Sequence, residues 1–204
     1  MDQIIENLFE SVPKARILRL LVRNSDQKFS LDEIAARSQV RKPAVRRELQ
    51  KMIRYGLAEE RVVSREIKTD KSPKARFKKE RVYGINPKYY LLRELYDLIT
   101  KASVAPHDKL LKQIRGIGKI KLAIISGVFT QSENARTDLL IIGDGISKRK
   151  LDRFLAHAES ELGKPIQHTV METDEFQYRM DMYDRFLRDI LEYPHEKIIN
   201  RFNL

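Results

Sequence analysis

Between Ser30 and Gly56, apolar residues recur three and four positions apart, which is the spacing of one face of a helix. They are Leu31, Ile34 and Ala35 in a first segment and Val45, Leu49, Met52 and Ile53 in a second. Pro43 suits the first turn of the second segment, because an N–H group is unpaired there in any case. Gly56 suits its end. We expect two short amphipathic helices joined by a tight turn.

The residues on either side predict supporting helices and a β-hairpin. Helical spacing indicates a helix over 14–23, with Pro13 at its start, and a shorter helix over 2–9. After Gly56, segments 57–67 and 77–85 are rich in Val, Ile, Phe and Tyr and flank a polar, turn-rich run. The expected order is therefore helices followed by a hairpin.

From residue 109 onwards, helical and strand patterns alternate. Strands are expected over 119–126, 138–144, 165–171 and 196–200, and helices over 109–115, 147–163 and 174–193. This alternation implies a mixed sheet covered by helices. We expect an α+β or α/β chain of two domains, residues 1–87 and 108–204. A linking helix within 88–107 has a broad apolar stripe that fits either a core helix or a dimer interface.

Charge is distributed unevenly along the chain. The net charge is +11, with 24 Lys and Arg against 14 Asp and Glu in residues 1–102 and 16 against 15 in residues 103–204. A solubilising charge would be spread evenly, so we expect a polyanionic partner for the first half. There is no Cys, no apolar run of membrane-spanning length and no leader-like N-terminus. These features favour a cytoplasmic protein without a membrane partner.

The basic residues gather on the second helix of the central pair and on the hairpin. Such donors suit phosphates and guanine edges, although a solvated basic face is the simpler alternative. The candidate DNA-binding residues are Arg41, Lys42, Arg46, Arg47, Gln50, Lys51, Arg54, Lys74, Arg76, Lys78 and Lys79. We expect Arg46, Arg47, Gln50 and Lys51 to enter a groove, and Arg41 and Lys42 to hold phosphates.

The motifs KARILRLL, LDEIA and VRRELQKMIRYGL, followed by a hairpin that ends in Tyr-Gly-Ile-Asn-Pro, occur in this order within about the first 95 residues. Together they resemble the winged helix-turn-helix domain of prokaryotic ArsR-like regulators. The resemblance implies binding of double-stranded DNA through a recognition helix at about 42–55 and a wing at about 58–85. Gln39 stands where that family often has Gly, and Arg41-Lys42-Pro43 replaces a common Ser-Pro start.

The stretch LAIISGVFTQSENARTDLLIIGD, with the following helix and GKPIQHTVMETDEF, resembles the minimal nucleotidyltransferase fold. Active members hold Mg²⁺ and nucleotide phosphates with a Gly-Ser turn and an Asp-x-Asp strand. Here Gly127 is followed by Val128, and Asp138 is preceded at the first Asp position by Arg136. Gln167 stands at the place of a third carboxylate. Catalysis is therefore not expected.

Gly127 and Asp138 stay candidates for binding a nucleotide, whereas the simpler interpretation of Asp138 is a structural hydrogen bond. The histidines, His107, His157, His168 and His195, show no ligand spacing, so no metal or other cofactor is expected beyond a Mg²⁺-nucleotide. We expect a DNA-binding transcriptional regulator with a non-catalytic second domain for sensing or interaction. The alternatives are an active nucleotidyltransferase that modifies a protein, RNA or small molecule, and an antitoxin-like partner protein.

Overall fold

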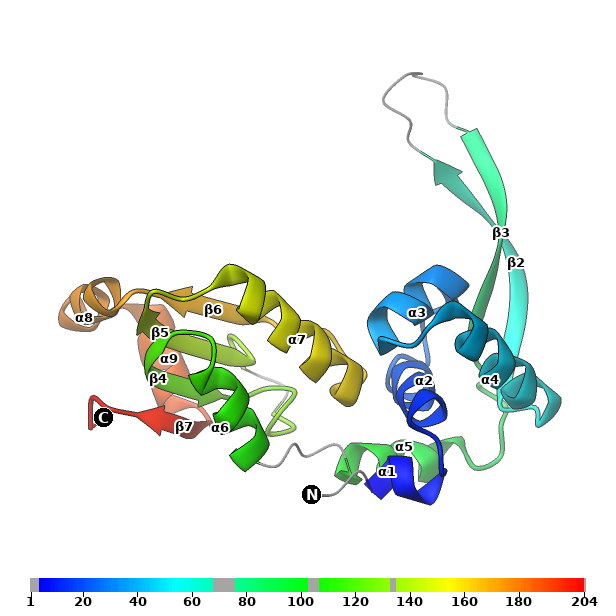
Figure 1. The fold of residues 1–204 in the computed structure, drawn as a ribbon, viewed down its shortest axis with the longest axis horizontal. Coiled ribbons are helices and arrows are strands. Elements are labelled where there is room, and N and C mark those ends of the chain that lie inside the picture. Colours follow the sequence, from blue (N-terminus) through cyan, green and yellow to red (C-terminus); the bar gives the residue numbers. More distant parts are fainter. Residues whose placement is uncertain (1–3, 68–75, 103–106, 133–134, 204) are drawn as a thin grey trace. The chain divides into compact units, whose positions relative to one another are not determined.

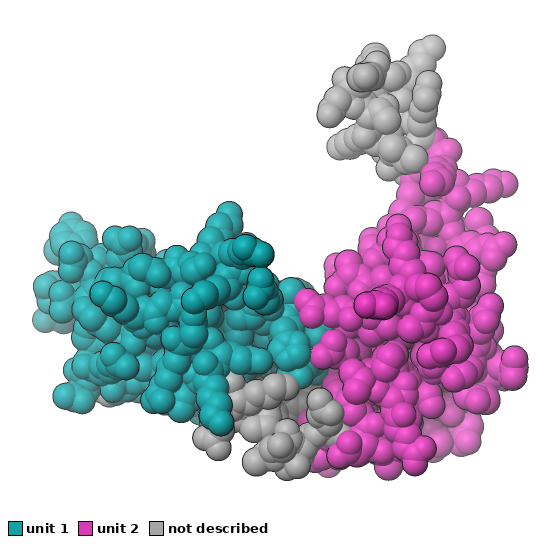
Figure 2. All heavy atoms as spheres, in the orientation of Figure 1, with its two compact units in different colours: residues 1, 103–204 teal, residues 2–102 magenta. Residues whose placement is uncertain are grey.

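The computed structural model describes residues 4–67, 76–102, 107–132 and 135–203. The described chain is a mixed α+β structure that divides into two compact units. We call Asp2–Ala102 the N-terminal unit (magenta in Figure 2) and Ser103–Leu204 the C-terminal unit (teal in Figure 2). Across the described residues, no helix combines the length and the apolar character needed to cross a bilayer.

The N-terminal unit contains five helices and a three-stranded antiparallel sheet among its described residues. In chain order the elements are α1 (Ile4–Leu8), α2 (Val12–Arg23), β1 (Phe29–Ser30), α3 (Leu31–Ser38), α4 (Lys42–Arg54), β2 (Ala58–Ile67), β3 (Arg76–Ile85) and α5 (Leu92–Ala102). The strand order is β1-β3-β2. Strands β2 and β3 pair along their whole length and extend away from the helices as a long hairpin (Figure 1).

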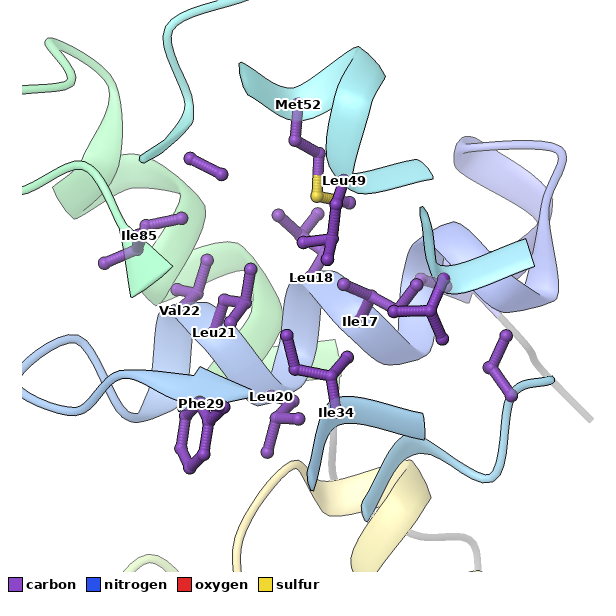
Figure 3. Close-up of a cluster of buried hydrophobic side chains, with 14 of the residues drawn as sticks. Ile17, Leu18, Leu20, Leu21, Val22, Phe29, Ile34, Leu49, Met52 and Ile85 are labelled. Atoms are coloured by element: carbon purple, nitrogen blue, oxygen red, sulfur yellow. The ribbon is translucent and has the colours of Figure 1, made fainter. Parts of the chain in front are cut away.

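The core of this unit is built around α2. Ile17, Leu18 and Leu21 are completely or almost completely buried, and Ile34 of α3 and Leu49 of α4 pack in the same cluster (Figure 3). The apolar positions that predicted the central helix pair are thus the positions that attach α3 and α4 to α2. At its N-terminus, α2 is capped by Ser11, whose side chain accepts a hydrogen bond from the Lys14 N–H at 3.3 Å.

Two features differ from the expected elements of this unit. The two-residue strand β1 was not predicted, because Phe29 and Ser30 are recognisable as a strand only through their pairing with Tyr83 and Val82 of β3. The helix expected to link the two domains is also part of the N-terminal unit. Ile99 of α5 is 0% exposed and belongs to the core cluster around α2, so packing attaches this helix to the preceding residues.

The C-terminal unit is a mixed four-stranded sheet with helices on both faces. Its elements are α6 (His107–Arg115), β4 (Lys119–Ile125), β5 (Leu139–Asp144), α7 (Lys148–Leu162), β6 (His168–Met171), α8 (Thr173–Asp181), α9 (Arg185–Glu192) and β7 (Glu196–Asn200). The order is β6-β5-β4-β7, with β5 and β6 parallel and the other pairs antiparallel. Apolar residues of α6 and α7 pack on one face of the sheet, and those of α8 and α9 on the other.

One helix predicted for this unit is divided in two. The expected helix over 174–193 breaks between α8 and α9, where Tyr183 adopts a left-handed conformation with a φ of 52°. Asp184 then caps α9, because its carboxylate accepts a hydrogen bond from the Leu187 N–H at 3.1 Å. The apolar spacing continues across the break, so only this local capping distinguishes two helices from one.

Candidate nucleic-acid interface

Helix α4 has one buried and one exposed face. Val45, Leu49 and Met52 are buried in the core of the N-terminal unit, whereas Arg46, Gln50 and Arg54 are exposed. Those three exposed residues are four positions apart, so they form a row along the outward side of the helix. Packing against α2 and α3 therefore fixes which side chains of α4 face solvent.

Helix α3, which leads into the turn before α4, is capped at both of its ends. At the start of α3, the Ser30 hydroxyl accepts from the Glu33 N–H at 3.2 Å, and the Glu33 carboxylate accepts from the Ser30 N–H at 2.6 Å. At the end of α3, Gln39 is left-handed with a φ of 53°, and its N–H points back to the carbonyls of the last turn. Gln39 thus occupies the conformation that Gly takes with least strain.

The predicted contact residues of α4 divide into paired and unpaired side chains. Lys42 forms an ion pair with Asp32 at 2.9 Å, and Lys51 forms one with Glu48 at 3.1 Å. Within the described chain, Arg46, Gln50 and Arg54 have no such partner, and neither does Arg41 at the N-cap. The unpaired row is therefore the part of α4 most available to a ligand, and it includes Arg54, which the sequence did not single out for a groove.

Glu48 accounts for the pairing of Lys51 and of Arg47, and its role was missed at the sequence level. Its side chain is 3% exposed, and its Oε1 lies 3.1 Å from Lys51 Nζ and 3.4 Å from Arg47 Nε. The buried carboxylate of Glu48 thus pairs with both Lys51 and Arg47, which makes these two cations less available to a ligand. Its position was readable from the sequence, because residue 48 falls among Val45, Leu49 and Met52 on the apolar face.

Ion pairs join the hairpin to α3 and to the segment before β1. Arg65 of β2 lies 3.0 Å from Glu33 of α3 and 3.4 Å from Glu80 of β3. Lys28 donates a hydrogen bond to Glu59 of β2. Burial alone would raise the pKa of Glu33, but hydrogen bonds from Arg65 and Ser30 outweigh it and hold that pKa below its usual value. These contacts orient the hairpin relative to α3.

The predicted basic wing is described only in part. Lys78 and Lys79 of β3 are exposed and lie opposite Arg65 and Ser64 of β2. Lys74 and the side chain of Arg76 lie outside the described residues. The described part of the hairpin therefore adds two exposed lysines to the cations of α4.

In the C-terminal unit, the structure brings the two candidate nucleotide-binding residues together. The carboxylate of Asp138, on a residue that is 9% exposed, accepts hydrogen bonds from the Val128 N–H at 2.7 Å and the Gln167 N–H at 2.8 Å. Gly127 has a φ of 53°, and a Cβ there would lie 2.0 Å from Asp138 Oδ1. Each oxygen of Asp138 thus accepts a backbone hydrogen bond, one from the turn after β4 and one from the residue just before β6.

Arg136 does not share this environment. Its guanidinium Nη2 lies 2.8 Å from the carboxylate of Asp189 on α9, and its Nε donates to the same oxygen at 2.9 Å. In the parts of the chain that the structure describes, no group of three or more His, Cys, Asp or Glu side chains has a geometry that could hold a metal ion. The local geometry is a hydrogen-bonded junction between strands and a turn.

Comparison with known proteins adds no relative. No family model, no curated protein and no solved structure matches the chain.

Proposed function

We propose that this protein is a sequence-specific DNA-binding transcriptional regulator that reads double-stranded DNA with its N-terminal unit. The observation that carries this proposal is the row formed by Arg46, Gln50 and Arg54, which is exposed and unpaired among the described residues. Arg can donate two hydrogen bonds to guanine, and Gln can donate to and accept from adenine. A rigid helix carrying both types of side chain suits the major groove.

The arrangement of elements supports the same proposal. Helices α2, α3 and α4 precede a long antiparallel hairpin, and the sheet order is β1-β3-β2. We interpret α4 as the recognition helix and β2-β3 as the wing of an ArsR-like winged helix-turn-helix domain. The wing contributes the exposed Lys78 and Lys79 for contacts with the DNA backbone. In this proposal the protein is cytoplasmic, and a homodimer would match two half-sites.

For the C-terminal unit we propose a degenerate nucleotidyltransferase-like domain that senses or binds a partner without catalysis. This is supported by Asp138, whose oxygens already accept backbone hydrogen bonds, and by Arg136, which occupies the place of a second carboxylate and is paired with Asp189. Asp138 is a poor Mg²⁺ site for another reason too, because the described residues place no group of acidic side chains with it that could hold the ion.

The proposal can be tested by selecting bound sequences from random duplex DNA with the full chain. We expect enrichment of a common motif of a few base pairs, and loss of that motif when the selection is repeated with Arg46→Ala. A pool that stays random over successive rounds would contradict sequence-specific binding. Transfer of label from nucleoside triphosphates in the presence of Mg²⁺, abolished by Asp138→Ala, would instead support the nucleotidyltransferase alternative.

A further inference from the structure

The C-terminal unit has a small net charge, but its cations are concentrated on one face of its sheet. Helices α8 and α9, on the opposite face, mix five acidic residues, Asp174, Glu175, Asp181, Asp189 and Glu192, with three basic ones, Arg179, Arg185 and Arg188. On the other face, the end of α6 and the first half of α7 are strongly basic. The C-terminal unit therefore has a cationic surface although its net charge is close to zero.

This surface is formed by side chains from the end of α6, the start of β4 and the first half of α7, which lie close together although β5 separates β4 from α7 in the chain. All of its cations are exposed, and among the described residues none has a carboxylate partner. We call it the α6–α7 basic patch: Lys112, Arg115, Lys119, Lys148, Arg149, Lys150 and Arg153. Asp152 is the one exposed acidic residue within the same stretch of α7.

Backbone contacts hold the parts of the patch together. Lys150 Nζ donates to the Gly116 carbonyl at 3.0 Å, and the Ser147 N–H donates to the Ile117 carbonyl at 3.1 Å. Gly118 is packed so closely that a Cβ there would lie 3.0 Å from Ile146 Cα. The end of α6 and the start of α7 are thus fixed side by side, and the patch is a defined surface of one unit.

The placement of the cations on α7 is unfavourable for the isolated chain. Lys148, Arg149 and Lys150 occupy the first turn, at the positive end of the helix dipole, and this turn contains no acidic residue. Helix α8 shows the usual arrangement, with Asp174 and Glu175 in its first turn. A bound anion would compensate the unfavourable charge on α7. Helix α4 begins in a similar way, with Arg41 and Lys42 and no side-chain cap.

From these observations we propose that the α6–α7 basic patch is a second DNA-contacting surface, which binds the phosphate backbone without reading its sequence. The partner is identified as duplex DNA because the same chain presents the α4 row, so this inference rests on the proposed function. Because the two surfaces are on one chain, binding by α4 raises the effective concentration of DNA at the patch. The patch then adds affinity for every sequence while α4 supplies the preference.

The test compares two triple variants of the full chain. Lys148→Gln, Arg149→Gln and Arg153→Gln neutralise the patch and keep Lys150, whose hydrogen bond to Gly116 is structural. Arg185→Gln, Arg188→Gln and Arg201→Gln remove the same charge from exposed positions in and beyond α9. Binding to the selected duplex and to a scrambled duplex is measured by fluorescence anisotropy across a range of salt concentrations.

We expect the patch variant to bind both duplexes more weakly and to reduce the slope of log K against log salt by up to about 3, since each lost phosphate contact removes about 0.9. Its preference for the selected site should be unchanged. Identical slopes for the patch variant and the α9 variant would overturn the proposal, and stronger binding to single-stranded RNA than to duplex DNA would do the same. If the patch proposal fails but Arg46→Ala still abolishes the preference for the selected duplex, the proposed function is unaffected. If the wild-type chain binds no duplex DNA, the patch proposal and the proposed function are both overturned.

Discussion

At the scale of single residues, the carboxylate of Asp138 is used in hydrogen bonds within the fold. In the nucleotidyltransferase-like pattern this carboxylate would bind a metal, but here its two oxygens accept hydrogen bonds from the N–H groups of Val128 and Gln167. The Gly127 turn is shaped around it, because any side chain at that position would collide with Asp138 Oδ1. The carboxylate of Asp138 therefore joins a turn to the segment that leads into a neighbouring strand.

We expect Asp138→Asn to lower the free energy of unfolding of the C-terminal unit by about 1–3 kcal/mol, because an amide nitrogen would face a buried N–H donor. Urea denaturation followed by circular dichroism measures this loss, with Asp181→Asn, an exposed residue of α8, as the control that should be neutral. A fully stable Asp138→Asn protein that no longer binds a nucleotide would contradict the structural role.

Gln39 is a second residue whose backbone conformation matters more than its side chain. With a φ of 53° it carries the left-handed strain that Gly avoids. We expect Gln39→Gly to raise the free energy of unfolding of the N-terminal unit by about 0.5–1 kcal/mol, whereas Ala36→Gly, in the exposed interior of α3, should lower it by about 1 kcal/mol. Thermal unfolding of both variants measures the difference. A loss of stability in Gln39→Gly would mean that its side chain makes a contribution that outweighs the strain.

At the scale of elements, most of the fold could be predicted because it depends on local patterns. The spacing of Val45, Leu49 and Met52 was sufficient to identify α4 and its buried face. What could not be predicted depends on contacts distant in sequence: β1 exists only through its pairing with β3, and Arg65 meets Glu33 across 32 positions of the chain. For the same reason the sequence indicated a basic face on α4 but not which of its cations are held by Glu48 and Asp32.

The ion pair between Arg65 and Glu33 should make the attachment of the hairpin sensitive to pH. The pKa of Glu33 is lowered in the folded chain, so the unfolded state binds more protons between the ordinary carboxyl pKa and the lowered one. The contribution of Glu33 is therefore complete above its ordinary pKa of about 4.3 and is lost as the pH falls through the lowered value.

We expect Glu33→Gln to cost about 0.5–1 kcal/mol near pH 7, the range for a partly exposed pair, and less as the pH falls below about 4. Gln at this position can still accept the capping hydrogen bond from Ser30, which isolates the effect of the charge. Urea unfolding at several pH values measures it, with Asp97→Asn, an exposed residue of α5, as the control. A cost that does not change with pH would mean that the charge of Glu33 has no stabilising role.

At the scale of the whole molecule, the two units differ in net charge, but each presents a group of exposed cations. The N-terminal unit contains the excess of cations that is visible in the sequence, and it presents part of this excess as an unpaired row on α4. The C-terminal unit is nearly neutral, yet it presents the α6–α7 basic patch. In the proposed function, α4 reads the sequence of the DNA while the hairpin and the patch contact its backbone, so mutations should separate preference from affinity.

The most direct test of the central claim is the equilibrium dissociation constant of wild type and Arg46→Ala for the selected duplex and for its scrambled counterpart, measured at one salt concentration. We predict that Arg46→Ala weakens binding to the selected duplex by about 1–3 kcal/mol, while binding to the scrambled duplex changes about twofold or less because a single charge among many contacts is removed. Lys101→Ala, an exposed change on α5, should leave both constants unaltered. An equal loss on the two duplexes would contradict base reading by α4 and leave it as a nonspecific cationic surface.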